Sequence, residues 1–294
     1  MSSLNSISSE KLWRLIGVPH GPALVDVRAK EDFAADPRFI PGAVRRANAT
    51  VSDWVSEFAA RPVVVICENG QGLSEGVAAC LRHGRASAAE ILVGGHVAWA
   101  QAGLPLVTES KLPSRDPQGR TVWVTRERPK IDRIACPWLI RRFVDPAAVF
   151  LFVSPAEVRA VAERFNGAPF DVEGVFWSHR GDRCTFDVLL EELGLQSEPL
   201  EKLAAMVRGA DTARLDLAPE APGLLAASLG QSRMYSDDLE QLAASMTLYD
   251  AFYRWARDAS DETHDWPANP PKKVTERSVQ RRTGSLQPDS TKAK

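Results

Sequence analysis

Three short apolar runs, at residues 23–27, 63–66 and 91–93, most constrain the fold of this chain. The second run is β-branched throughout and does not alternate with polar residues, which is typical of a strand buried on both faces of a parallel sheet. Between the second and third runs, the apolar spacing predicts a helix over 74–83, with Cys80 among its core residues. Strands that alternate with helices predict an α/β fold, a parallel sheet flanked by helices.

The second half of the chain has a different pattern. Short strands are predicted at 121–124 and 148–153, and helices at 131–143 and 155–165. From 186 to 255 the apolar spacing is almost entirely helical. We therefore expect a second, mostly helical α+β domain.

Composition along the chain suggests where the domains end. We expect a first domain over 1–108 and a linker over 109–120, which contains Pro113, Pro117 and Gly119. The second domain then covers 121–259. Residues 260–294 are polar and rich in proline, with few large apolar side chains, so we expect a disordered tail.

Charge and cysteine content exclude several classes of protein. The net charge of −2 gives no broad attraction to nucleic acid, and no apolar run approaches the roughly 20 residues that span a bilayer, so we expect neither nucleic-acid nor membrane partners. Residues 1–16 show no secretory signal pattern. Four cysteines in 294 residues do not form a disulfide framework, which favours a reducing cytoplasm.

Cys67 directly follows the strand at 63–66 and precedes a glycine-containing loop and a helix. A thiol in this place, under a helix N-terminus, is favoured as a thiolate nucleophile, because backbone N–H groups stabilise an anion there. The alternative is a buried cysteine that packs as a small apolar residue. The predicted anion-binding loop comprises Glu68, Asn69, Gly70, Gln71, Gly72, Leu73 and Ser74.

Flanking motifs favour Cys67 as a thiolate nucleophile over Cys67 as a packing residue. Leu-Val-Asp-Val-Arg at 24–28 with Ile-Pro-Gly-Ala at 40–43, and Gly-Gly-His-Val-Ala-Trp at 94–99 with Ala-Gly-Leu-Pro at 102–105, resemble the opening and closing signatures of rhodanese domains. The resemblance implies a five-stranded parallel sheet and a persulfide on Cys67, taken from a small inorganic sulfur donor and passed to a thiol acceptor. It also implies that Asp26 and Arg28 are scaffold residues.

The loop after Cys67 departs from the common rhodanese length. Six residues separate Cys67 from Ser74, one more than usual, which resembles related cysteine-dependent phosphatases and arsenate reductases whose larger loop holds a tetrahedral oxyanion. Those enzymes carry an arginine in the loop, whereas this loop has no cation and Glu68 adds negative charge. Sulfur transfer is therefore favoured over oxyanion reduction, and oxyanion reduction over phosphatase activity. A sensor without turnover is a further alternative.

A second group of chemistry-bearing residues lies in the second domain. Asp132 and Cys136 share a helical face, and His179 lies close in sequence to Cys184. Cysteine, histidine and carboxylate are metal ligands, so Cys136, His179 and Cys184 are candidates to hold a metal ion, the one cofactor that the sequence suggests. The alternative is a set of buried ion pairs that joins a helix to a loop.

This second domain resembles the C-terminal domain of the ChrB family of chromate-resistance proteins. The motifs lie at 123–126, 129–143, 179–184 and 209–212, and they imply a role in handling chromate, by sensing or by chemistry. Asp211 is interpreted as a helix cap in preference to a metal ligand. Oxyanion or metal binding is predicted for Asp132, Arg133, Cys136, Arg141, His179, Cys184 and Asp211.

Overall fold

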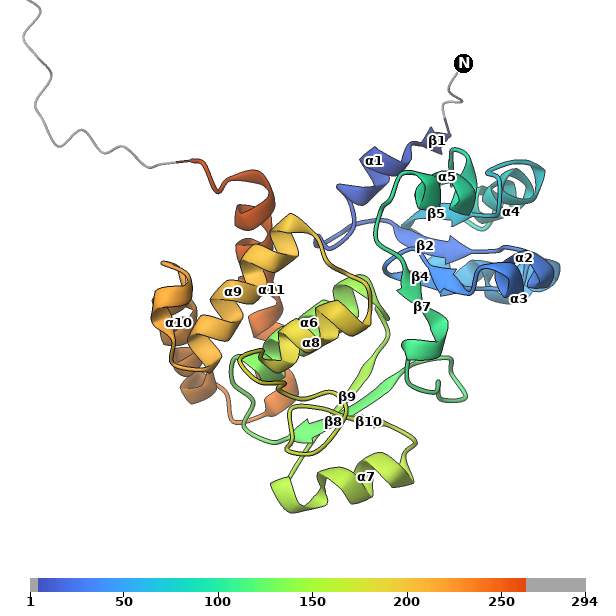
Figure 1. Ribbon diagram of the computed structural model, residues 1–294. Helices are drawn as coiled ribbons and strands as arrows, with labels where there is room; N and C mark the ends of the chain where they lie inside the picture. Colours follow the sequence, from blue (N-terminus) through green and yellow to red (C-terminus); the bar gives the residue numbers. More distant parts are fainter. Residues whose placement is uncertain (1–4, 263–294) are drawn as a thin grey trace, which may run out of the picture. The chain divides into compact units, whose positions relative to one another are not determined.

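A five-stranded parallel sheet organises the first half of the structure, a computed structural model that describes residues 5–262 (Figure 1). The strand order is β1-β6-β5-β2-β4, so the apolar strands β2 and β5 lie inside the sheet. The bounds are β1 (Ser6–Ile7), β2 (Ala23–Asp26), β4 (Ala43–Arg45), β5 (Pro62–Ile66) and β6 (Ala88–Leu92). The predicted α/β architecture is confirmed, with β1 and β4 added as edge strands. A two-stranded antiparallel pair joins β3 (Arg38–Phe39) to β7 (Val107–Thr108).

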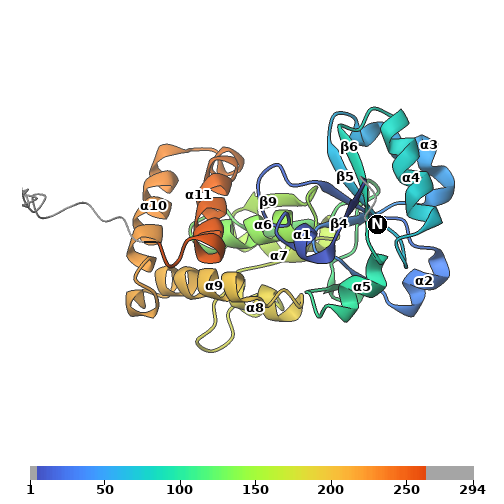
Figure 2. The ribbon, with the colours of Figure 1, turned by 90° about the horizontal axis from the view of Figure 1, so that it is seen from above.

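Helices cover both faces of this sheet, because successive strand residues point to opposite sides. Val63 and Val65 enter one apolar cluster, whereas Val64 and Ile66 enter another. Figure 2 shows α3 and α4 on one side of the sheet and α2 and α5 on the other. The bounds are α1 (Ser9–Trp13), α2 (Lys30–Ala35), α3 (Val51–Trp54), α4 (Gly72–His83) and α5 (Gly95–Gln101).

Helix α4 begins two residues before the predicted start and corrects one expectation about its cysteine. Val77, Ala78 and Leu81 form its buried stripe, but Cys80 lies off that stripe and is exposed. The prediction of Cys80 as a core residue is therefore wrong. Its thiol offers a control for the buried Cys67 on the same domain.

The second half contains a smaller sheet of three parallel strands in the order β10-β8-β9. Helix α7 (Val158–Arg164) packs on one face through Val158 and Ala162, which contact Val124. Trp123 and Phe150 point to the opposite face and join the main apolar cluster. The bounds are β8 (Val122–Arg126), β9 (Val149–Val153) and β10 (Ala168–Pro169), of which the first two were predicted.

Five longer helices complete this half, as the helical spacing predicts. They are α6 (Asp132–Phe143), α8 (Thr185–Glu192), α9 (Glu198–Asp211), α10 (Ala221–Met234) and α11 (Asp238–Asp258). Helix α6 is buried on almost every side, since its residues contact α8, α9 and α11. Asp250 of α11 binds α6 through hydrogen bonds. Its carboxylate accepts from the Trp138 ring nitrogen at 2.8 Å and from Nε and Nη2 of Arg142.

The two halves share one apolar core within residues 5–260. Trp13 of α1 lies between Trp99 of α5, at 6.1 Å between ring centres, and Phe143 of α6, at 6.4 Å. The Gly42 amide also donates to the Phe143 carbonyl at 2.7 Å. Residues 263–294 of the predicted tail lie outside the described residues. No described helix is long and apolar enough to cross a membrane.

Candidate functional site

Cys67 occupies the place that the strand–loop–helix pattern predicts. It directly follows β5, is 5% exposed, and lies at the carboxyl end of a central strand. Its Sγ is 3.1 Å from the Ser74 hydroxyl oxygen, which itself donates to the Gln71 carbonyl at 2.9 Å. The thiol therefore faces the first turn of α4.

The start of α4 leaves hydrogen-bond donors available near this thiol. The side chain of Gln71, at the N-cap, makes no capping hydrogen bond, and the Ser74 and Glu75 amides donate to its carbonyl. Within residues 5–262, the Gly72 and Leu73 amides have no protein acceptor. Unpaired N–H groups at a helix start stabilise negative charge. The loop 67–74, here called the Cys67 loop, can thus support an anionic sulfur.

Close backbone contact fixes the Cys67 loop against the turn before α5. A Cβ on Gly95 would lie 2.3 Å from the Cys67 carbonyl oxygen, and one on Gly70 would lie 2.3 Å from the Leu92 carbonyl oxygen. The His96 amide donates to the Cys67 carbonyl at 2.9 Å, and the Val97 amide donates to Glu68 at 3.1 Å. Backbone atoms, rather than side chains, hold this loop.

Arg28 is a buried cation of the same domain, but its N–H groups already donate to other residues. Its guanidinium makes a two-pronged contact with Asp26, 2.7 and 2.9 Å to one carboxylate oxygen, and donates to the carbonyls of Asp36 and Arg38. Glu68 Oε2 lies 4.0 Å from Nη1, the same nitrogen that donates to the Asp36 carbonyl. Asp26 and Arg28 are the predicted scaffold pair. Arg28 therefore has no free pair of N–H groups with which to bind an oxyanion in the Cys67 loop.

A second cluster lies in the other half, around His179. Its Nε2 atom is 3.3 Å from one carboxylate oxygen each of Asp132, Asp171 and Asp211. Asp132 is the first residue of α6, Asp211 is the last of α9, Asp171 follows β10, and His179 lies in the loop before α8. Elements distant in sequence therefore converge on one imidazole.

Burial and charge shift the titration of this cluster. Asp132 is 1% exposed and accepts the Thr185 and Phe186 amides, at 2.6 and 3.3 Å, from the start of α8. Burial raises the pKa of Asp132 to about 6, opposed by its hydrogen bond with His179. Hydrogen bonds with Asp132, Asp171 and Asp211 raise the pKa of His179 to about 12.

Asp171 is the member of the cluster that the sequence analysis did not single out. One of its oxygens lies 3.0 Å from Arg126 and 3.3 Å from Arg133, and the other accepts the Thr185 hydroxyl at 3.0 Å. Asp171 lies two residues after the end of β10, a two-residue strand that pairs with β8. That strand is too short to stand out in the apolar pattern.

Three other predicted residues of this half, Cys136, Cys184 and Arg141, lie apart from the carboxylate–histidine contacts. Cys136 and Cys184 are buried in the apolar core, and burial raises the pKa of both thiols. Arg141 stacks on Phe150, 5.0 Å from the ring centre. The interpretation of Asp211 as a cap of the next helix is wrong. Its carboxylate faces His179, because α9 ends there and directs the side chain into the cluster.

Cation ligands of suitable spacing come together in this cluster. Asp132, His179 and Asp211 each offer one ligand atom, and these atoms all lie within 4.8 Å of one another. The thiols of Cys136 and Cys184 are not part of any such group among residues 5–262. The structure thus gathers oxygen and nitrogen donors, without sulfur.

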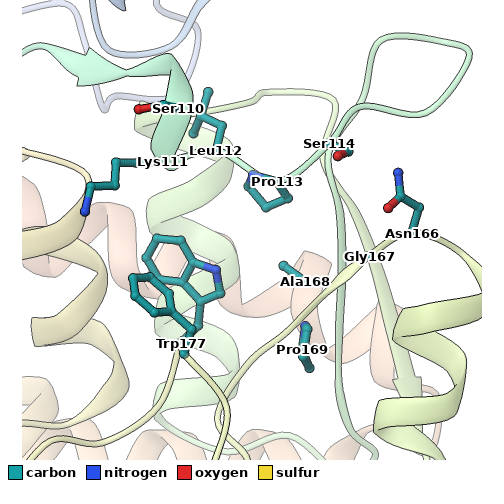
Figure 3. Close-up of a pocket in the computed structure, with 11 residues that line it drawn as sticks. Ser110, Lys111, Leu112, Pro113, Ser114, Asn166, Gly167, Ala168, Pro169 and Trp177 are labelled. Atoms are coloured by element: carbon teal, nitrogen blue, oxygen red, sulfur yellow. The ribbon is translucent and has the colours of Figure 1, made fainter.

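Two cavities lie elsewhere. One, of about 340 Å³, is lined by residues 110–114 and 166–169 together with Trp177 (Figure 3). The other, of about 660 Å³, has Arg141 and Arg142 on its wall, with Arg46 and Arg61 from the first half. Neither cavity contains Cys67 or His179.

Comparison with protein families agrees with both halves. Residues 8–102 match the family described as rhodanese-like domain, and residues 123–256 match the C-terminal domain of ChrB. The chain joins a rhodanese-like domain to a ChrB C-terminal domain. Cys67 belongs to the rhodanese-like domain, and the His179 cluster belongs to the ChrB C-terminal domain.

Individual relatives cover one domain each. Protein ChrB of Cupriavidus metallidurans is 40% identical over 141 residues, which is 46% of this chain and 42% of that protein. This chain thus spans less than half the length of that relative. Among solved structures, a rhodanese-related protein of Thermoplasma volcanium is 20% identical, with a TM-score of 0.31, over 36% of this chain and 99% of its own. A thiosulfate sulfurtransferase of Pseudomonas aeruginosa is 24% identical, with a TM-score of 0.32, over 35% and 19%.

Proposed function

We propose that the protein is a sulfurtransferase that carries sulfur as a persulfide on Cys67. The observation that supports this most directly is the place of the thiol, beside the Ser74 hydroxyl at the start of α4, where the Gly72 and Leu73 amides have no acceptor among residues 5–262. Amides without an acceptor stabilise both the attacking thiolate and the negative outer sulfur of the persulfide. The Ser74 hydroxyl accepts from the neutral thiol and donates to the Gln71 carbonyl, so it would turn to donate to the thiolate.

The chemistry balances without an added oxidant. The Cys67 thiolate attacks the outer sulfur of thiosulfate, a Cys–S bond forms, and the S–S bond of thiosulfate breaks to release sulfite. A thiolate acceptor, or cyanide in an assay, then attacks the outer sulfur and regenerates the Cys67 thiolate. This cycle requires a reduced Cys67, which fits a reducing compartment such as the cytoplasm.

Oxyanion reduction or sensing at the Cys67 loop is less well supported. Binding of a tetrahedral oxyanion calls for an arginine fork, and Arg28 is already bound to Asp26 and to two carbonyls. We further propose that sulfur transfer serves chromate resistance. The basis is the ChrB C-terminal domain over residues 123–256, whose family resemblance implies that role.

The test is transfer of sulfur from thiosulfate to cyanide by the purified full chain. We expect thiocyanate formation by the wild type and by Cys80→Ser, whose thiol is exposed on the same domain, and loss of formation to background in Cys67→Ser. Mass spectrometry should find one added sulfur atom on Cys67 after treatment with thiosulfate. A wild type that neither gains this sulfur nor forms thiocyanate would refute the proposal.

A further inference from the structure

We propose that Asp132, His179 and Asp211 of the ChrB C-terminal domain bind one divalent transition-metal ion of the Mn²⁺ or Zn²⁺ type. This assignment replaces the thiol-containing set suggested by the sequence with an oxygen and nitrogen set. It does not depend on the proposed role of Cys67, which belongs to the other domain.

Two of the three ligand-to-ligand distances in the cluster match the edges of a coordination shell, and all three atoms lie within 4.8 Å of one another. Ligand atoms about 2.1 Å from a metal lie about 3.4 Å apart in a tetrahedral arrangement and about 3.0 Å apart in an octahedral one. The His179 Nε2 atom lies 3.3 Å from both Asp132 and Asp211. A cation between these three atoms would reach all of them with only small side-chain movements.

Hydrogen bonding alone does not account for the arrangement. One Nε2–H can point at one acceptor, yet three carboxylate oxygens lie at the same 3.3 Å from it. Asp132 is 1% exposed, and a buried carboxylate close to two others requires positive charge nearby. A divalent ion supplies more of that charge than a single proton on His179 does.

Asp171 differs from the other two carboxylates because two arginines neutralise it. Arg126 and Arg133 both contact the same oxygen, and the Thr185 hydroxyl binds the other. Asp171 is therefore assigned as an outer partner that orients the site. Within residues 5–262 no arginine forms a salt bridge with Asp211, and Arg133 interacts with its charge only at longer range. Asp211 therefore keeps more of its charge for the metal than Asp171 does.

The donor set and the exposure indicate the type of site. Carboxylate and imidazole ligands suit Mn²⁺ and Zn²⁺, whereas closed structural zinc sites are usually rich in cysteine. The His179 side chain is 39% exposed and that of Asp211 is 20% exposed. One side of the site therefore faces solvent, so water or a small anion can complete the shell, as in open metal sites.

Calorimetric titration of the chelator-treated full chain with Mn²⁺, and separately with Zn²⁺, tests the assignment. We expect one ion per chain for at least one of the two metals, and at least a tenfold loss of affinity in His179→Gln and in Asp211→Asn. Asp182→Asn is the matched control. It removes the same charge as Asp211→Asn, from an exposed residue of the His179 loop, and should bind like the wild type.

Two more variants separate this proposal from its alternatives. Cys136→Ser should keep the wild-type affinity if the metal has no thiol ligand, and Cys67→Ser should keep it if the two sites are independent. Far-UV circular dichroism confirms that each variant is folded. The assignment is wrong if neither metal binds to the wild type, or if folded His179→Gln and Asp211→Asn bind as tightly as Asp182→Asn.

Discussion

Two groups of buried charge, one in each domain, are neutralised in opposite ways. In the rhodanese-like domain, the carboxylate of Asp26 meets the fork of Arg28, and each charge has one main partner of the opposite sign. In the ChrB C-terminal domain, three carboxylates surround the single imidazole of His179. The first arrangement is complete and acts as scaffold. The second brings like charges together, and such crowding is typical of a place where a cation binds.

The largest effect on stability is expected from breaking the ion pair between Asp26 and Arg28. Arg28→Ala leaves Asp26 buried without its main partner and removes donors to two carbonyls, so we expect a loss of about 3–5 kcal/mol in the free energy of unfolding. Urea denaturation measures it. Arg254→Ala, which breaks an exposed pair with Asp258, should change the same quantity by less than about 1 kcal/mol. Equal losses in the two variants would contradict the distinction between buried scaffold and surface pairs.

The next largest effect concerns the backbone that holds the Cys67 loop. Gly95 has φ +59° and its Cβ would meet the Cys67 carbonyl, so we expect Gly95→Ala to lose about 2–3 kcal/mol of stability and to slow sulfur transfer. Gly76→Ala, in α4 with open space around it, should gain about 0.5–1 kcal/mol. Denaturation curves measure the stability of both variants. If Gly95→Ala were as stable as Gly76→Ala, the backbone at Gly95 could move away from the Cys67 carbonyl at little cost.

Removing charges from the His179 cluster should have unequal effects in chelator-treated protein. His179→Gln takes the cation from three carboxylates and should lower stability by about 1–2 kcal/mol, less than for a fully buried pair because the ring is 39% exposed. Asp211→Asn relieves like-charge repulsion and should change stability by less than about 1 kcal/mol. Thermal unfolding of the two variants measures the difference. If Asp211→Asn lost more stability than His179→Gln, the Asp211 carboxylate would be held in a stabilising ion pair, as Asp26 is with Arg28.

The smallest effect should appear as a dependence on pH. The hydrogen bond from Arg38 lowers the pKa of Asp36, with burial opposing and His96 adding to the lowering. A lowered pKa in the folded state stabilises the protein above the ordinary value of about 3.9 and loses that contribution as the pH falls below it. Asp36→Asn should therefore be less stable than the wild type near about pH 7, and the difference should shrink toward about pH 3. A constant difference across that range would exclude this pairing.

The sequence was sufficient to predict where Cys67 and its loop lie in the fold. Cys67 and its loop are contiguous, and the strand before and the helix after can each be predicted from local apolar patterns. Parallel pairing then places the end of β5 at the edge where α/β sites lie. The backbone approach at Gly95 could not be predicted, because it depends on how two separate turns pack.

The arrangement of the His179 cluster could not be predicted from local sequence patterns. Asp132, His179 and Asp211 were each predicted from their residue types and motifs, but their convergence depends on the packing of α6, α8 and α9. Asp211 was misread because a carboxylate at the end of one helix has the same local sequence whether it caps the next segment or points inward. Asp171 was missed because its neighbouring strand is only two residues long.

The aromatic contact across the domains has a consequence for synthesis of the chain. Trp13 and Trp99 leave the ribosome before Phe143, yet all three rings meet in one core. While α6 is still being made, the nascent rhodanese-like domain therefore exposes an apolar surface that its own residues do not cover. Ribosome-bound chains from which α5 has emerged but α6 has not should bind chaperones, and chains from which α6 has also emerged should release them.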